Sequence, residues 1–352
     1  MNLPAPLVFE VEEGLDPQTE RPVQMGHFSR NWAEEEEMDA LSQDMESGRV
    51  SDKQALLRAQ KLASRNPRNL EIQNFLACRF WQLEMRDEAT QIWQQAYQQA
   101  LALVPKGYKG QISWFEVDNR SFLRVAHGYL LGLMHQRDGK AAKSLAKKML
   151  AWCPSDNLGV RYLMGDISLL SGDHKTALKL FLKEAHGSPA QWYQAALIVF
   201  RQEDYVSACT YLRRGIAANP YIAEGLTGRT ILQEHHYWHS SNRYGPDWAV
   251  DYLQAAGQAW SDDEIAFVDW VFNSSIVLRE RSELMELQEG LTCEQDPQNR
   301  GQYAFRSTYF LDTITDEKSK AMVRKYKNRF GVDVWPWMRH GRYAQSGGKP
   351  IR

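Results

Sequence analysis

The chain has 352 residues, of which 43% are hydrophobic and 24% are charged, and its formal net charge is −2. Ordinary soluble composition at this length is typical of two or three compact domains or of one extended repeat array. A charge so close to zero gives no whole-chain reason to expect binding to nucleic acid or to an anionic membrane.

Prolines and acidic residues dominate residues 1–50, which we interpret as an N-terminal arm. Residues 1–30 are expected to be largely extended, and a short acidic helix is expected near Trp32–Glu46. The glutamate run in this helix is interpreted as a solvated face. No stretch of alternating strand pattern is recognised before residue 300, which favours helices and loops over strands in this part of the chain.

The helical signal becomes strong at Ser51. Ser51 and Gln54 fit a capping box, in which the serine hydroxyl accepts from an unpaired backbone N–H and the glutamine side chain reaches back. Apolar residues then recur at helical spacing. Prolines, which cannot continue a helix, separate the helical runs at Pro67, Pro105, Pro154, Pro189 and Pro220.

Four segments of this region share one pattern, namely residues 69–105, 121–154, 157–189 and 190–220. Each has a small residue in its first helix, a polar turn, an alanine early in its second helix and a closing proline. One such helical hairpin cannot bury its apolar face alone, so neighbouring hairpins must stack. An insertion rich in glycine and aromatic residues, 106–120, interrupts the series.

These segments resemble the tetratricopeptide repeat (TPR), a helix–turn–helix unit of about 34 residues. Small residues, aromatics that fill gaps and closing prolines carry the resemblance: Ala77, Ala89, Trp93, Ala96, Ala142, Gly165, Gly172, Ala177, Phe181, Pro189, Ala196, Ala208 and Pro220. The order of glycines and aromatics from Lys106 onward is also similar to a group of bacterial repeat proteins of poorly defined role. The resemblance implies an all-α, right-handed α-solenoid of TPR-like helical hairpins over residues 51–225.

The segment Cys153–Gly165 is interpreted as the joint between two hairpins. Pro154 closes one hairpin, because a proline lacks the N–H that a continuing helix needs. Either Asp156 or Asn157 then caps the following helix with a side-chain oxygen. Gly165 lies where the next two helices are expected to pack closely, since a residue without a Cβ lets two backbones approach.

After the array we expect a helical C-terminal cap over residues 226–330 and a Trp-containing basic tail over residues 331–352. Such caps cover the apolar end that a terminal repeat would otherwise expose. Ser261 and Glu264 fit a second capping box. Three helices are predicted within the cap, over Asp247–Trp260, Ser261–Leu291 and Asp316–Phe330.

The first helix of each hairpin is expected to line the concave groove, with side chains about one turn apart facing a ligand. Aromatics with a few cationic and amide groups suit an extended peptide or an amphipathic helix. The competing interpretation of the aromatics is packing between repeats. The predicted groove residues are Asn74, Cys78, Trp81, Arg124, His127, Leu131, Tyr162, Asp166, Leu169, Tyr193, Leu197 and Phe200, with Arg120 and Arg161 at the margin.

Some TPR domains clamp a terminal carboxylate between cationic and amide side chains. Arg120, Arg124 and Asn74 resemble part of such a clamp, although the full charge pattern is incomplete. Trp335 and Trp337 of the tail are a second candidate, either as a strap that docks on the last helices or as a motif that a partner binds. The basic cluster before them is expected to meet the acidic N-terminal run or RNA, and comprises Lys318, Lys320, Arg324, Lys325, Lys327 and Arg329.

His235, His236 and His239 form the densest histidine cluster. On a helix, His235 and His239 would share a face, as metal ligands can, whereas the competing interpretation is a polar aromatic loop. The sequence contains no HExxH, no GxSxG and no Walker-type phosphate loop. We therefore expect no cofactor and no enzymatic activity, with a metal-dependent enzyme at the histidine cluster as an alternative.

The four cysteines, Cys78, Cys153, Cys209 and Cys293, form no CxxC pair, which favours a reducing compartment over disulfides or structural zinc. We find no secretory signal pattern and no apolar run of the roughly 18–20 residues that span a bilayer. The sequence therefore predicts a cytoplasmic scaffold, adaptor or chaperone, without membrane insertion, that binds a peptide or partner protein in its groove. An RNA-binding helical repeat is a further alternative.

Overall fold

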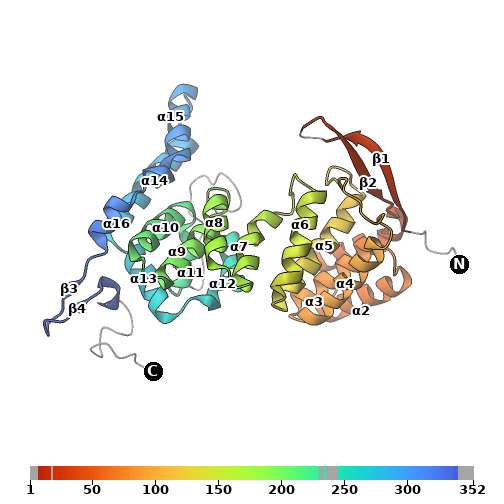
Figure 1. Cartoon of the computed structure of the whole chain (residues 1–352), viewed down its shortest axis with the longest axis horizontal. Helices are drawn as coiled ribbons and strands as arrows, with labels where there is room; N and C mark the ends of the chain where they lie inside the picture. The colour runs from red at the N-terminus through yellow and green to blue at the C-terminus, as the bar shows by residue number, and fades with distance from the viewer. Residues whose placement is uncertain (1–6, 17–18, 230–233, 235–244, 340–352) are drawn as a thin grey trace. The chain divides into compact units, whose positions relative to one another are not determined.

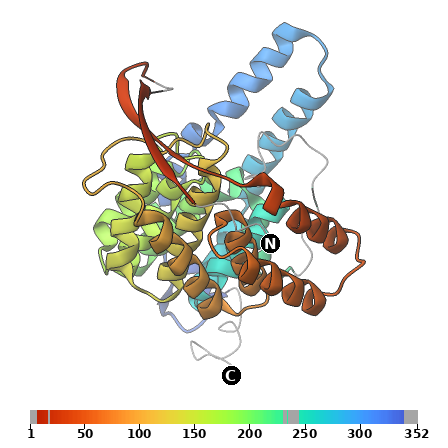
Figure 2. The ribbon, with the colours of Figure 1, turned by 90° about the vertical axis from the view of Figure 1, so that its right-hand side faces the viewer.

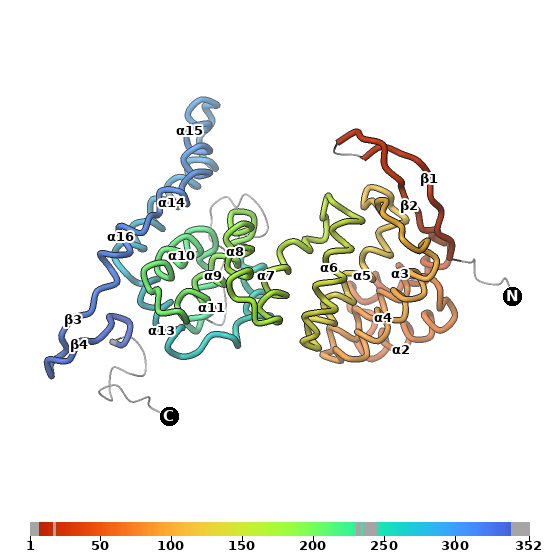
Figure 3. Tube along the Cα trace, in the orientation of Figure 1, coloured from red at the N-terminus to blue at the C-terminus, as the bar shows by residue number. Residues whose placement is uncertain are grey.

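The computed structural model describes residues 7–16, 19–229, 234 and 245–339, and these form an all-α fold with two small β-hairpins (Figures 1 and 3). The chain divides into two compact units, Met1–Ala177 (unit 1) and Leu178–Arg352 (unit 2), so the predicted array has residues in both. The described α-helices of unit 1 are α1 (Glu36–Glu46), α2 (Asp52–Arg65), α3 (Leu70–Gln82), α4 (Arg86–Leu101), α5 (Asn119–His135), α6 (Gly139–Trp152) and α7 (Val160–Leu170). The division between the units falls inside α8 (His174–Glu184). Those of unit 2 are α9 (Ala190–Arg201), α10 (Tyr205–Ala218), α11 (Pro220–Leu226), α12 (Pro246–Ala256), α13 (Asp262–Phe272), α14 (Ser275–Cys293), α15 (Pro297–Thr308) and α16 (Asp316–Met322).

The N-terminal arm contains a β-hairpin that the sequence pattern did not predict. Strands β1 (Phe9–Leu15) and β2 (Pro22–Phe28) pair antiparallel, and Figure 2 shows them as a long curved ribbon. The side chain of Asn119 at the start of α5 holds the base of the hairpin. Its Oδ1 accepts from the N–H of Phe28 at 2.9 Å, and its Nδ2 donates to the carbonyl of Gly26 at 2.9 Å. The sequence predicted a largely extended arm but showed no strand pattern here, because the contacts that hold the hairpin come from Asn119, about ninety positions away.

Consecutive helices of unit 1 pack against one another from α1 to α7. The helix expected near Trp32–Glu46 is present, as a short 3-10 turn followed by α1. The capping box at the start of α2 is also confirmed. Gln54 N–H donates to the Ser51 hydroxyl at 3.4 Å, and the Gln54 side chain accepts from the Ser51 N–H at 3.0 Å. Local sequence signals therefore place these helix starts correctly.

Small residues bring α4 and α5 into close contact. A Cβ added to Gly128 of α5 would lie 2.2 Å from the ring of Trp93, a distance that real Cβ atoms do not reach. Trp93 of α4 is buried, and its indole N–H donates to the Asn74 side chain of α3 at 3.0 Å. Trp93 thus joins three successive helices. This is the position that the sequence predicts for an aromatic residue that fills the gap between neighbouring hairpins.

The joint before α7 is capped by Asp156. Its two carboxylate oxygens accept from the N–H groups of Val160 at 2.7 Å and Arg161 at 3.0 Å. Asp156 has a φ of +48° and Gly159 a φ of +72°, so the backbone makes a tight left-handed turn here. Of the two caps that the sequence allowed, the structure selects Asp156, because only its carboxylate reaches the first turn.

Unit 2 differs from the predicted cap at two helix boundaries. The helix expected over Ser261–Leu291 is broken into α13 and α14, because the Ser274 side chain caps α14 by accepting from the Val277 N–H at 3.3 Å. The helix expected over Asp316–Phe330 ends at Met322. Two short antiparallel strands follow, β3 (Tyr326–Lys327) and β4 (Asp333–Val334).

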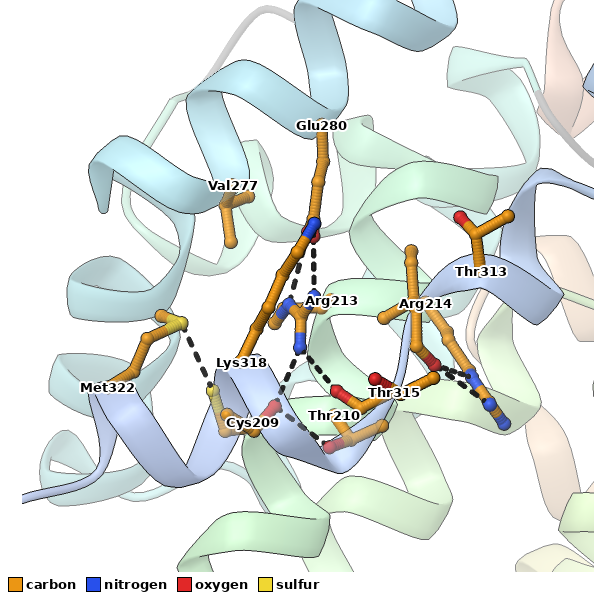
Figure 4. Close-up of polar contacts among 12 residues, drawn as sticks. Cys209, Thr210, Arg213, Arg214, Val277, Glu280, Thr313, Thr315, Lys318 and Met322 are labelled. Carbon is orange, nitrogen blue, oxygen red and sulfur yellow. Dashed lines mark hydrogen bonds and ion pairs between the residues drawn. The ribbon is translucent and has the colours of Figure 1, made fainter.

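A buried arginine fixes α16 to the rest of unit 2 (Figure 4). The side chain of Arg213 on α10 is fully buried, and its guanidinium donates to both carboxylate oxygens of Glu280 on α14. The same guanidinium donates to the Thr315 carbonyl at 2.9 Å and to the Ser319 hydroxyl at 2.8 Å. The four hydrogen bonds of this buried cation therefore tie α10 to α14 and to the start of α16.

Candidate partner-binding surface

Three first helices of unit 1 leave the same face partly exposed. Helix α5 contacts both α3 and α7, so the three lie side by side. On each helix the residues at spacings of three or four that the sequence assigned to a groove are partly exposed. On α5 their immediate neighbours are buried, whereas on α3 and α7 several neighbours are partly exposed as well. We call this set the first-helix face: Asn74, Cys78 and Trp81 on α3, Arg124, His127 and Leu131 on α5, and Tyr162, Asp166 and Leu169 on α7.

The α3 part of the face is aromatic and amide in character. Trp81 lies 5.4 Å from Trp93 and 6.0 Å from His135 of α5, measured between ring centroids. The guanidinium of Arg86 lies 4.2 Å from the Trp81 ring, which is the geometry of a cation–π contact. Trp81 is therefore held in one orientation while part of its ring remains accessible.

The α5 part carries two arginines beside one tryptophan. The guanidinium carbons of Arg120 and Arg124 lie 5.2 Å and 5.6 Å from the ring of Trp114, in the insertion before α5. Arg124 also pairs with Glu71 of α3 at 2.7 Å. Arg120 donates to the Trp114 carbonyl at 3.0 Å and forms no ion pair with any residue that the structure describes. The charge of Arg124 is therefore balanced by Glu71, whereas Arg120 brings a cation without a described acidic partner next to the Trp114 ring.

The α7 part begins at the capped joint. Arg161 pairs with Asp156 at 3.1 Å, and its guanidinium lies 4.6 Å from the ring of Tyr162. Further along the helix, burial raises the pKa of the Asp166 carboxyl to about 7. On α5, burial lowers the pKa of the His127 imidazole to about 4. Near neutral pH His127 is therefore uncharged, and the net charge of the face depends on Asp166.

Substitutions at Asp166 and His127 are expected to change the pH dependence of the stability of unit 1 in opposite directions. The folded-state pKa of Asp166 lies above its unfolded value, so ionisation costs stability as the pH rises from about 4 to about 7. The folded-state pKa of His127 lies below its unfolded value, so stability is lost as the pH falls from about 6.5 to about 4. Asp166→Asn removes the first loss and His127→Gln the second.

Urea unfolding of the full chain at several pH values between about 4.5 and 8 measures both effects. At about pH 8 the free energy of unfolding of Asp166→Asn is expected to exceed that of the wild type by on the order of 2 kcal/mol. The wild type, in which the two effects oppose each other, should show the flattest profile between about pH 4.5 and 6.5. Identical profiles for the three proteins would contradict the two pKa shifts.

The corresponding face of α9 in unit 2 is covered by other helices. Tyr193 is completely buried, its hydroxyl donates to the Asn219 carbonyl at 2.7 Å, and its ring lies 6.1 Å from that of Tyr252. Leu197 is buried in the same core, and Phe200 is partly buried 4.9 Å from the Phe267 ring. The α9 residues therefore offer little or no surface to a partner, and we exclude Tyr193 from the candidate site.

The tail tryptophans form a strap within the same chain. Trp337 is buried, and its ring lies 4.8 Å from Phe267 and 5.0 Å from Tyr205. Trp335 is partly buried and stacks on Trp337, with 5.0 Å between the centroids and 9° between the planes. Of the two interpretations of this segment, the structure therefore shows docking in cis.

A second surface in unit 1 was not anticipated. A groove of about 450 Å³ runs between α2 and α4 over α3, with an uncharged lining. Its floor includes Leu76 and Phe80, and amide side chains border it. The glutamine-rich composition of α4 was the available signal, but glutamines on an exposed helix are ordinarily solvated. The amides that line it are Gln60, Gln73, Gln95 and Gln99.

The remaining candidates gain no support from the described part of the chain. The histidines of the proposed metal cluster, His235, His236 and His239, lie outside the described residues. Within the described ranges, no group of three or more His, Cys, Asp or Glu side chains is placed to hold a metal ion. In the same ranges no helix has both the length and the apolar character needed to cross a membrane.

The sequence matches no model of a protein family, and a search of curated proteins likewise finds no match.

Proposed function

We propose that the protein is a non-enzymatic scaffold or adaptor whose TPR-like helical hairpins bind a peptide or a segment of a partner protein. The observation that supports this most directly is the first-helix face, where three adjacent helices leave the same stripe partly exposed. Helical repeats that use such a surface recognise extended or helical peptides by shape and by a few polar contacts. A cytoplasmic location is part of the proposal and fits four cysteines without disulfides.

The chemistry of the face favours a peptide that carries an acidic group next to an aromatic or apolar residue. Arg120 and Arg124 flank Trp114, so a carboxylate can accept from a guanidinium while an adjacent ring packs on the indole. Arginine and tryptophan are also the side chains that most often dominate binding energy at interfaces. Phe115 and Val117, which follow Trp114 in the chain, are exposed and add apolar surface.

Panning of the full-length protein against a display library of short random peptides tests this proposal. We expect the enriched peptides to contain Asp or Glu beside an aromatic residue. Replacing Arg120 and Arg124 together with glutamine should weaken their binding by about tenfold or more, because two charge-assisted hydrogen bonds are lost. Fluorescence anisotropy with a labelled peptide measures the change in Kd.

Two matched variants control this experiment. Lys147→Gln with Lys148→Gln removes two exposed cations from α6 and should leave Kd unchanged. Gln95→Lys with Gln99→Lys alters the uncharged groove between α2 and α4 instead. If this second pair abolishes binding while the arginine pair has no effect, the peptide binds in the groove and the proposed surface is wrong.

A further inference from the structure

The β3–β4 hairpin near the end of unit 2 is a rigidly built projection. Asn328 organises its turn, since its side-chain Oδ1 accepts from the N–H groups of Phe330 at 2.9 Å and Val332 at 3.0 Å. The Asn328 N–H donates to the Val332 carbonyl at 2.9 Å, and Gly331 adopts a φ of +76°. In Figure 1 this turn lies at the outer edge of unit 2.

The base of the hairpin is fixed to the helices of unit 2. Tyr326 pairs with Val334 across the strands, and the buried Trp337 lies in the 3-10 turn Pro336–Arg339 shortly after β4. Trp337 packs 5.4 Å from Trp270 of α13, measured between ring centroids. Neither this anchor nor the Asn328 turn uses the side chains at the tip, so those side chains are not needed to build the hairpin.

The tip combines exposed apolar side chains with a high local positive charge. Phe330 is 67% exposed and Val332 is 56% exposed, and the two lie on the same turn, separated only by Gly331. The stretch from Lys320 to Asp333 contains one acid, Asp333, and five cations, all of them exposed. Those cations are Lys320, Arg324, Lys325, Lys327 and Arg329.

We propose that this tip binds the surface of membranes that contain anionic phospholipids. Phe330 and Val332 would enter the boundary between headgroups and acyl chains, while Lys327 and Arg329 beside them contact the lipid phosphates. Lys320, Arg324 and Lys325 lie nearer the base of the hairpin, where the Lys325 ammonium is 4.8 Å from the Trp335 ring, and they add longer-range attraction. Two apolar side chains alone would bind a bilayer weakly, and cations alone would bind any polyanion. Together, the exposed apolar pair and the cations favour the surface of an anionic membrane. The contact is peripheral and requires no spanning helix.

Single-stranded RNA is the other polyanion that a basic surface can bind. Stacking of a base on Phe330 would use its ring, but Val332 offers no π surface for stacking. The guanidinium of Arg329 already lies 4.7 Å from the Phe330 ring. The adjacent apolar pair therefore favours a lipid surface over RNA. This inference involves unit 2 only and is independent of the proposed peptide-binding face in unit 1.

Flotation of the full-length protein with vesicles tests the proposal. We expect binding to vesicles of phosphatidylcholine mixed with phosphatidylglycerol, weaker binding at higher salt, and little binding to phosphatidylcholine alone. Lys327→Glu with Arg329→Glu should weaken binding by about tenfold or more. Phe330→Ser with Val332→Ser should weaken it by about fivefold or more, because the apolar contact is lost.

Matched substitutions elsewhere serve as controls. Lys147→Glu with Lys148→Glu changes the charge by the same amount on an exposed helix of unit 1. Phe305→Ser with Leu57→Ser removes apolar side chains that are 65% and 58% exposed, respectively. Both control pairs are expected to float as the wild type does. Circular dichroism of every variant confirms that the fold is retained.

Three outcomes would overturn the proposal. The first is the absence of binding to the anionic vesicles. The second is binding that the serine pair leaves unchanged, which would reduce the contact to non-specific charge attraction. The third is binding to a single-stranded RNA oligonucleotide that both tip variants abolish while anionic vesicles are not bound, which would assign the tip to RNA.

Discussion

Replacing Arg213 with methionine is expected to lower the free energy of unfolding of unit 2 by roughly 3–5 kcal/mol, because it leaves the Glu280 carboxylate buried without its main partner. Lys318 lies 3.5 Å from Glu280 but is itself mostly exposed, so it compensates only in part. Urea unfolding of the full chain measures the loss. Hydrogen exchange read by mass spectrometry should locate it in α10, α14 and α16.

A second substitution separates the loss of the pair from the loss of packing. Arg213→Met with Glu280→Leu removes both charges, and we expect it to recover at least half of the lost stability. Arg214→Met is the matched control, since Arg214 is the next residue, and among the described residues it donates to the Ile314 carbonyl and lies 5.1 Å from the Trp192 ring without an ion pair. It should cost about 1 kcal/mol. An equal loss for Arg213→Met and Arg214→Met would show that the buried pair contributes nothing special.

Trp93→Ala is expected to destabilise unit 1 by roughly 3–5 kcal/mol. The buried indole fills the space against Gly128, lies 5.4 Å from the Trp81 ring at a tilt of 54° and donates to Asn74. Its removal therefore opens a cavity at the contact of α3, α4 and α5. Phenylalanine in its place should cost less, because the ring retains most of the packing. Urea unfolding followed by far-ultraviolet circular dichroism measures both changes.

Trp32→Ala provides the comparison for a tryptophan of the same unit. Trp32 is 53% exposed, and its only described ring contact is the guanidinium of Arg30 at 3.7 Å. Its removal should cost less than about 1 kcal/mol. If Trp93→Ala is as mild as Trp32→Ala, then Trp93 does not hold the three helices together in the way that its contacts indicate.

The sequence predicted the helices of this protein well because their signals are local. Ser51 with Gln54 marks the start of α2, and Asp156 marks the start of α7, through hydrogen bonds that span three to five residues. The all-α class followed from apolar residues at helical spacing and from prolines between the runs. The right-handed solenoid and the relation to TPR proteins remain predictions that rest on the repeat pattern.

The same local signals failed for the N-terminal hairpin, for the end of α16 and for the groove between α2 and α4. The hairpin β1–β2 depends on Asn119, and α16 ends early although its sequence continues with a helical pattern. Beyond the end of α16, the Asn328 side chain accepts from the backbone N–H groups of Phe330 and Val332 in a turn. Such local side-chain bonds to the backbone compete with helix formation. The groove with its glutamine border was missed because amides on an exposed helix give no distinctive pattern.

The sequence by itself determined the all-α class, the approximate starts of helices such as α2 and α7, and which side of each first helix carries aromatic and cationic residues. Only the tertiary structure decided which of those sides remain accessible. On α5 the side chains of Arg124 and His127 stay partly exposed, whereas Tyr193 on α9 is covered by Tyr252 and its neighbours. The physical reason is that helix formation depends on residues within a few positions, while burial depends on contacts between residues far apart in the chain.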